Sequence, residues 1–205
     1  MKFNLNSIII KIAVMRNLFL ALLAMVAFVA CNNNDGLEVG FDITIGPSGE
    51  YSVSGARTVS SEEFADKVIG AGWVRKAFHH INKNGSIDPV NQDARDDLRG
   101  HPFVYIYFEN DNQFKYAEET AVTYTGIIQE YLFRNSSINI LDTDEHIQTD
   151  YYQVVDITEN KLTVVRCTTY YHSDNQFAHI SSYQEFERMS EEQLNKFKET
   201  FHEDI

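Results

Sequence analysis

The sequence predicts a mainly β fold with flanking helices, of the α+β class, in which an antiparallel meander of strands forms a barrel and a C-terminal helix follows. Residues 73–186 divide into short segments rich in aromatic and β-branched side chains. Polar turns such as Asn84-Gly85 and Glu159-Asn160 separate these segments, with no helical crossover between them. A helix-capping pattern stands on either side of the strand region. Many short strands without crossovers favour an antiparallel barrel or sandwich.

Residues 1–30 have the composition of a lipoprotein signal peptide. This segment contains Lys and Arg but no acidic residue, and its apolar run at 18–30 is too short to span a bilayer. The sequence Phe28-Val29-Ala30-Cys31 resembles a bacterial lipobox, with Phe28 where Leu is usual. The resemblance implies that Cys31 is the site of lipid attachment. The alternative is a buried N-terminal helix that ends at a core cysteine.

A lipid on Cys31 predicts lasting attachment to a membrane, because each buried methylene group contributes about 0.8 kcal/mol. Asn32 replaces the Asp associated with retention in the inner membrane, which favours the outer membrane. The periplasmic and the cell-surface orientation both stay open, and translation from Met1 and from Met15 both fit the pattern. Without residues 1–30 the chain has 14 Lys and Arg against 30 acids, a net charge of −16.

Residues 31–59 are expected to form a tether and an N-terminal hairpin. The polar, glycine-bearing stretch 32–40 resembles a flexible linker. Residues 41–45 alternate apolar and polar side chains, and a Gly-Pro-Ser-Gly turn separates them from a second short strand at 51–53.

Residues 60–205 are expected to form the folded β domain, which opens with a short helix. Ser60 is a helix N-cap, and Glu63 stands where it completes a capping box. Phe64 and Val68 share one face of this helix, and two nearby glycines end it.

The strands then follow one another. Their predicted ranges are 73–81, 103–109, 113–117, 122–130, 137–141, 151–157, 161–171 and 177–186. In the second of these, Phe103, Tyr105 and Tyr107 alternate with apolar residues, so both faces are apolar. Packing in a covered barrel and lining of a ligand cavity both produce such a strand. Tyrosine offers a ring and a hydroxyl, which suits an amphipathic ligand.

A second helix closes the chain. Ser190 caps it, Gln193 completes a capping box, and Leu194, Phe197 and Phe201 form one apolar stripe. We expect this stripe to pack on the outside of the barrel or across its mouth; the alternative is a helix that binds a partner.

Three segments resemble the lipocalin-like (calycin-type) domains of small bacterial envelope lipoproteins. They are Gly70-Ala71-Gly72-Trp73, the hairpin at residues 108–114, and the strand 152–157 followed by Asn160-Lys161-Leu162. The resemblance covers roughly residues 60–190 and implies a barrel that binds a small ligand.

Within this resemblance, Trp73, Tyr105 and Tyr107 are the candidate ligand-binding residues. Two features depart from the family pattern. Residues 89–100 form a long polar insertion, and Trp73 has no identified arginine partner, although Arg166 is available.

Composition excludes several functions. Thirty acids against 17 Lys and Arg give a net charge of −13, and nucleic-acid binding needs clustered basic residues that this chain lacks. Two cysteines cannot form a disulfide framework or a four-cysteine zinc site.

No catalytic signature, metal site or cofactor motif is predicted. The seven histidines have no metal-ligand spacing, and the adjacent His79 and His80 point to opposite faces of a strand. Segment 80–88 does not fit a calcium loop, because the first ligand position would be His80 and the twelfth, usually a bidentate Glu, would be Asn91. Its Asn84-Gly85 pair indicates a tight turn. Cys167 lies within a strand, where cysteine usually acts as a small buried apolar residue.

Three functional hypotheses follow. The first is a non-enzymatic, lipid-anchored envelope lipoprotein that binds a small or amphipathic ligand in its barrel. The second is a protein–protein interaction or accessory module of a cell-surface complex, with the partner unknown. The third is an enzyme, which would need Cys167 or a histidine cluster in a cleft with other polar groups.

Overall fold

The computed structural model describes residues 36–47, 51–94, 103–119, 124–141, 148–171 and 177–203. The predicted signal peptide and Cys31 lie outside these residues. Within the described ranges, no helix has both the length and the apolar character needed to cross a membrane.

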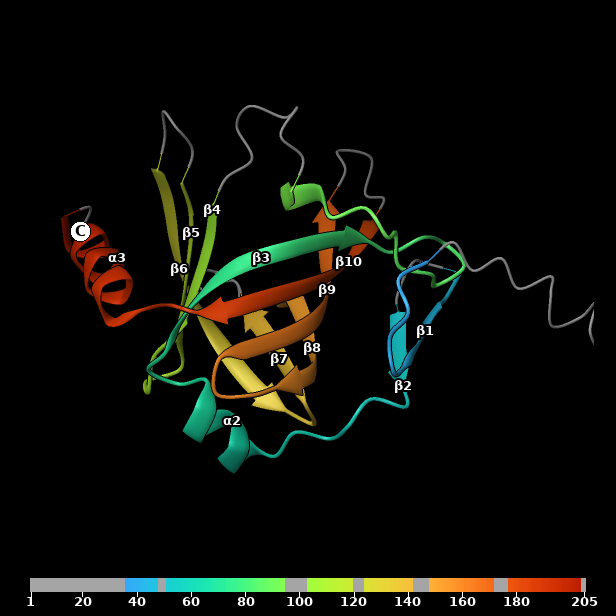
Figure 1. Ribbon diagram of the computed structural model, residues 1–205, viewed down its shortest axis with the longest axis horizontal. Coiled ribbons are helices and arrows are strands. Elements are labelled where there is room, and N and C mark those ends of the chain that lie inside the picture. The colour runs from blue at the N-terminus through green and yellow to red at the C-terminus, as the bar shows by residue number, and fades with distance from the viewer. Residues whose placement is uncertain are drawn as a thin grey trace, which may run out of the picture. The chain divides into compact units, whose positions relative to one another are not determined.

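Eight strands form a closed antiparallel barrel in which each strand pairs with the next along the chain (Figure 1). They are β3 (Gly72–His80), β4 (Phe103–Phe108), β5 (Gln113–Glu119), β6 (Tyr124–Arg134), β7 (Ser137–Leu141), β8 (Gln148–Ile157), β9 (Lys161–Tyr171) and β10 (Phe177–Arg188). The last strand, β10, pairs with β3 and closes the barrel. The predicted fold class, mainly β with an antiparallel meander barrel and a C-terminal helix, is confirmed.

Strand β6 extends beyond its predicted end at residue 130. The two residues of the β6–β7 turn, Asn135 and Ser136, have φ of 53° and 62°. Positive φ at both central positions is typical of the tight hairpin turn that matches strand twist. The strands therefore pair up to the turn itself, at Arg134 and Ser137. This turn is difficult to predict from the sequence because neither of its two central residues is a glycine.

One end of the barrel is closed by α2 (Ser61–Lys67). The Ser60 side chain accepts a hydrogen bond from the backbone N of Glu63 at 3.1 Å, as predicted. The Glu63 carboxylate does not complete the capping box, because it binds Arg57 at 2.9 Å and Lys67 at 3.3 Å. Phe64 of this helix is buried against the barrel interior.

The hairpin of β1 (Asp42–Ile45) and β2 (Tyr51–Ser54) packs on the outer face of the barrel. Its cluster includes Val155 of β8, Val165 of β9 and Tyr183 of β10. The Tyr51 hydroxyl donates to the backbone O of Val165 at 2.7 Å.

The stretch expected to be a tether is in contact with the barrel from Gly36 onward. The backbone N of Leu37 donates to the backbone O of Ile87 at 2.8 Å, and Leu37 and Val39 pack in the same cluster as the hairpin. Their apolar side chains give this stretch a surface to bury, which the polar tract before it lacks.

The C-terminal helix α3 (Glu191–Glu203) lies outside the barrel beside β4 and β5 (Figure 1). Ser190 and Gln193 form the predicted capping box, with reciprocal hydrogen bonds of 3.2 and 2.9 Å. Leu194 and Phe197 pack against Tyr105 and Tyr107. The apolar stripe of this helix is therefore directed at the barrel, and Phe201 lies outside the described side chains.

Candidate functional site

The end of the barrel next to α2 is filled by apolar side chains. Trp73, Phe108 and Phe114 are at most 1% exposed. Phe64 of α2 stacks on Phe133 of β6, with ring centroids 4.0 Å apart and 6° between the ring planes. This end is an ordinary hydrophobic core.

The opposite end, which we call the open end, has a different lining. Side chains alternate along a strand, so Tyr116 faces inward with Phe114, Tyr152 with Val154, and Arg166 with Val164. Asp150 and Arg75 also face inward, in β8 and β3. We call the five inward-facing residues Arg75, Tyr116, Asp150, Tyr152 and Arg166 the polar layer.

The centre of the polar layer is an ion pair between Asp150 and Arg166. The Arg166 guanidinium donates to both carboxylate oxygens, with Nη2 to Oδ2 at 2.6 Å and Nε to Oδ1 at 3.3 Å. The two side chains are only 17% and 12% exposed. The Arg166 guanidinium also lies 5.2 Å from the ring centroid of Tyr152 and 5.8 Å from that of Tyr116. One cation is thus held by a carboxylate and two aromatic rings.

Burial and charge act on these groups in opposite directions. Burial raises the pKa of Tyr152 and Tyr116 well above the ordinary tyrosine value, while the charges of Arg166 and Arg75 lower it. Burial alone would lower the pKa of Arg166, but Tyr152 and Asp150 hold the pKa of its guanidinium above its ordinary value. Arg166 therefore stays charged and both tyrosines stay neutral at physiological pH.

Arg75 connects the polar layer to the segment that follows β3. Its guanidinium donates to Asp93 at 2.8 and 3.0 Å and lies 4.9 Å from the ring centroid of Phe78. Asp93 belongs to the short 3-10 helix η1 (Gln92–Ala94). Asn91 fastens this segment to β3, since its side chain accepts from the backbone N of Phe78 at 3.0 Å. The part of the predicted insertion up to residue 94 is thus folded against the barrel.

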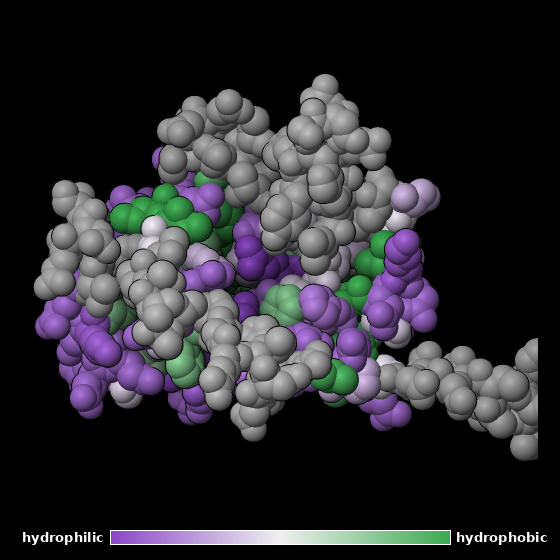
Figure 2. Space-filling model, turned by 90° about the horizontal axis from the view of Figure 1, so that it is seen from above, coloured by the Kyte–Doolittle hydropathy of each residue, from purple (hydrophilic) through white to green (hydrophobic). Residues whose placement is uncertain are grey.

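Beyond the polar layer, the inner wall carries Ile127 of β6 and Glu118 of β5. Ile127 pairs with inward-facing Tyr116 and is nevertheless 47% exposed. Glu118 lies next to Val104, an interior residue, and its carboxylate accepts a hydrogen bond from the Tyr116 hydroxyl. Figure 2, which looks at the molecule from above, shows strongly hydrophilic residues in the middle of this face. The open end therefore combines exposed apolar surface with fixed charges.

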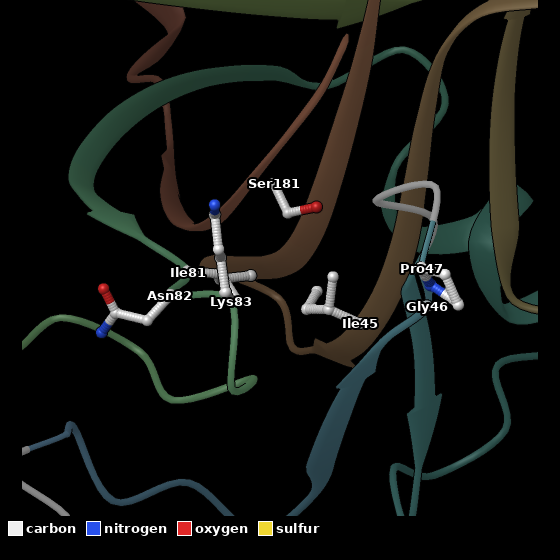
Figure 3. A pocket seen from close by; sticks show the side chains of 7 residues that line it. All are labelled: Ile45, Gly46, Pro47, Ile81, Asn82, Lys83 and Ser181. Carbon is white, nitrogen blue, oxygen red and sulfur yellow. The ribbon is translucent and has the colours of Figure 1, made fainter. Parts of the chain in front are cut away.

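A shallow hollow of about 270 Å³ lies on the outer side of the barrel (Figure 3). It is bordered by the end of β1, the turn that follows β3, and β10; its lining residues are Ile45, Gly46, Pro47, Ile81, Asn82, Lys83 and Ser181. Lys83 is the one charged residue among these seven. The hollow lacks the convergent polar groups of a binding site, and we attribute it to the junction between hairpin and barrel.

The candidate residues Trp73, Tyr105 and Tyr107 do not come together. Trp73 is fully buried in the core at the α2 end. Tyr105 and Tyr107 lie on the outer face of β4, with ring centroids 6.0 and 6.3 Å from that of Phe197 in α3. This placement departs from the expectation of one shared cavity, because α3 covers the face of β4 that carries both tyrosines.

The arginine that contacts Trp73 is Arg188, not Arg166. The Arg188 guanidinium lies 5.4 Å from the Trp73 ring and donates to the backbone O of Lys67 at 2.6 Å. It therefore ties the start of β3 to the end of α2. Arg188 was not predicted from the sequence, because the pairing of β10 with β3, which brings Arg188 opposite Trp73, is not visible in the chain order.

The other residues considered for chemistry lie apart. Cys167 is 8% exposed, and burial raises the pKa of its thiol, which makes it a poor nucleophile. His79 is buried with Nδ1 2.8 Å from the backbone O of Asp88, whereas His80 is exposed on the other face. Asn84-Gly85 forms the predicted tight turn, with Gly85 at φ 85°. Among the described residues, no three His, Cys, Asp or Glu side chains are grouped as metal ligands.

One signal in the sequence could have indicated the polar layer. Leu162, Val164 and Arg166 occupy the same face of one strand, so an arginine continues an apolar face. A charged residue there predicts either a buried partner or the solvent-accessible end of a barrel.

No family model matches the chain, and no curated protein matches it. Similar solved structures include bovine odorant-binding protein in complex with undecanal, at 8% identity and a TM-score of 0.35, over 64% of this chain and 79% of that chain. The same bovine protein with a selenium-containing odorant has 8% identity and a TM-score of 0.36, over 65% and 83% of the two chains. A deswapped triple mutant of it has 9% identity and a TM-score of 0.31, over 65% and 85%.

Proposed function

We propose that the protein is a non-enzymatic, lipid-anchored envelope lipoprotein that binds a small amphipathic ligand in the open end of its barrel. One observation carries the ligand-binding part. Ile127 faces the inside of a closed barrel and is still 47% exposed, directly beside Tyr116 of the polar layer. An apolar side chain in that position gains free energy when an apolar group covers it.

The polar layer supports binding because it adds little to stability. Removing two charges from water is costly, and apolar residues of similar volume often replace a buried ion pair without loss of stability. The core at the α2 end consists of apolar residues and shows that the barrel interior can be filled without charges. An ion pair with two tyrosines at the other end provides fixed donors and acceptors, which orient a ligand inside an otherwise apolar pocket.

The proposed ligand therefore has an apolar part and a polar part. Its apolar part would cover Ile127 and the ring of Tyr116, while its polar part would meet the charges at the open end. No group of the polar layer is assigned a catalytic role, since Arg166 and Asp150 satisfy each other.

The test is binding of the neutral fluorescent amphiphile N-phenyl-1-naphthylamine to the purified protein. Ile127→Ser should weaken binding roughly ten- to hundredfold, because burial of one such side chain contributes about 1.5–3 kcal/mol. Leu132→Ser is the matched control, since Leu132 lies in the same strand, is 54% exposed and faces outward. Absence of binding by the wild type, or equal weakening by both variants, would overturn the proposal.

The membrane anchor is a separate part of the proposal. Its support is the basic, apolar segment of residues 1–30 and the lipobox-like sequence at Cys31. We propose an outer-membrane location, periplasmic or cell-surface facing. Cys31→Ser should move the protein from the membrane fraction to the soluble fraction, or leave an unprocessed precursor, and globomycin should cause the precursor to accumulate. A wild-type protein found entirely in the soluble fraction would refute the anchor.

The alternative, an interaction module of a surface complex, has less support. Leu194 and Phe197 of α3 are directed at the barrel rather than at a partner. The exposed apolar residues Phe103 and Leu132 lie at opposite ends of the barrel and form no common patch.

A further inference from the structure

Glu118 is the inward-facing carboxylate of β5, and it forms no ion pair with any basic residue in the part of the chain that the structure describes. Asp150 binds Arg166 and Asp93 binds Arg75, each with both carboxylate oxygens. Glu118 accepts a hydrogen bond from the Tyr116 hydroxyl, and within the described part of the chain no lysine or arginine forms an ion pair with it. Among the described residues, the charged side chains named at the open end comprise two arginines and three carboxylates, so the carboxylate of Glu118 is the one that no arginine neutralises.

The surroundings of Glu118 are partly apolar. Glu118 pairs with residue 125 of β6 and Ile127 lies two positions further on, so the two side chains are diagonal neighbours on the inner face. Such neighbours have Cα atoms about 7–8 Å apart, within reach of one small molecule. Tyr116 contacts both groups, since its hydroxyl donates to the Glu118 carboxylate and the Arg166 guanidinium lies 5.8 Å from its ring centroid. A carboxylate, an aromatic ring and an exposed aliphatic side chain therefore share one wall.

This combination favours an organic cation over an anion. An anionic head group would have to displace Asp93 or Asp150 from a bidentate ion pair with its arginine. It would also be repelled by the negative charge of Glu118. An alkylammonium group instead gains a charge-assisted hydrogen bond with Glu118 and contact with the face of Tyr116. Its alkyl chain can cover Ile127.

We infer that the ligand of the open end is an amine-bearing amphiphile, with its ammonium group bound by Glu118 beside Tyr116 and its alkyl chain on Ile127. This inference rests on the proposed ligand-binding function and adds the chemical class of the ligand. Glu118 is its specificity-determining residue.

The test compares three probes with the same chain length, decylamine, decan-1-ol and decanoate, by calorimetric titration of the purified protein below their aggregation concentrations. The wild type should bind decylamine roughly tenfold more tightly than decan-1-ol, and decanoate most weakly. Glu118→Gln should remove the preference for the amine, so that decylamine and decan-1-ol bind with similar affinity.

Glu119→Gln is the matched control. Glu119 is the next residue of β5, and its carboxylate faces outward, where it accepts from the Tyr105 hydroxyl at 3.0 Å. The variant removes the same charge from the same strand, so it should keep the preference for decylamine. A loss of preference in both variants would assign the effect to overall charge and overturn the inference.

The outcomes separate the inference from the function it rests on. Equal binding of the three probes, or tighter binding of decanoate, would overturn the ligand class and leave a ligand-binding barrel. Failure of all three to bind would overturn both. The wild-type comparison stands by itself if Glu118→Gln proves unstable.

Discussion

The ion pair between Asp150 and Arg166 gives a prediction that separates binding from stability. Both side chains are less than one-fifth exposed. Either single replacement, Asp150→Leu or Arg166→Met, leaves one buried charge without its partner. We expect each to lower the free energy of unfolding by about 3–5 kcal/mol, nearer the lower value because some solvent reaches the pair. The double variant removes both charges together and should lie within about 2 kcal/mol of the wild type.

The assay is urea unfolding followed by the fluorescence of Trp73, which is the single tryptophan and is fully buried in the core. Under the proposed function, the double variant should also bind N-phenyl-1-naphthylamine more weakly while it remains folded. A double variant that loses the sum of the two single effects would refute this reasoning, because the pair would then be an element of stability.

Three further predictions concern the fold. Burial raises the pKa of Tyr131 to about 12. Above pH 10 this tyrosine has lost its proton in the unfolded chain but keeps it in the folded chain. The free energy of unfolding should therefore fall between pH 10 and about 12. In urea unfolding, Tyr131→Phe should lose less stability than the wild type between pH 10 and about 12, and an equal loss in the two proteins would contradict this. Gly85→Ala should lower the melting temperature far more than Gly70→Ala. Both glycines have positive φ, so an alanine is strained at either position. A Cβ at Gly85 would also lie 1.9 Å from a backbone oxygen of β1, whereas one at Gly70 meets no atom within 4 Å. Phe64→Ala should destabilise the protein by about 3–5 kcal/mol, whereas Leu132→Ala, at an exposed site, should change stability by about 0.5 kcal/mol or less in urea unfolding; equal effects would contradict the core assignment.

Local pattern predicted the strands and their faces, but not which face turns inward. In β4 the alternation of Tyr105 and Tyr107 with Ile106 is correct, and both faces are buried. The choice of inside and outside depends on α3, which follows β4 by more than eighty residues and covers the tyrosine face. Apolar content alone could not distinguish a face that lines a barrel from one that a helix covers.

The open end was harder to predict because its charges come from separate parts of the chain. Arg75 and Asp93 belong to the region of the first barrel strand, whereas Asp150 and Arg166 belong to β8 and β9. Register shifts in the β3–β10 and β8–β9 pairs also alter which residues share a face. Simple alternation along β3 would place Phe78 on the face opposite that of Trp73. Because of the register shift, Phe78 instead pairs with Gln184, which is on the same face of β10 as Phe186, and its ring lies against Arg75. A bulge of this kind leaves no clear mark in the sequence.

The overall charge and the local charge act on a ligand at different distances. A net charge of −13 attracts any cation from solution, but salt screens such attraction beyond about 8 Å at physiological ionic strength. Overall charge therefore affects the rate of encounter and cannot select an amine over another cation. Selection needs a group at the site, and Glu118 and Glu119 separate these two effects. The two residues contribute equally to the net charge, but only the side chain of Glu118 faces the inside of the barrel, beside Tyr116.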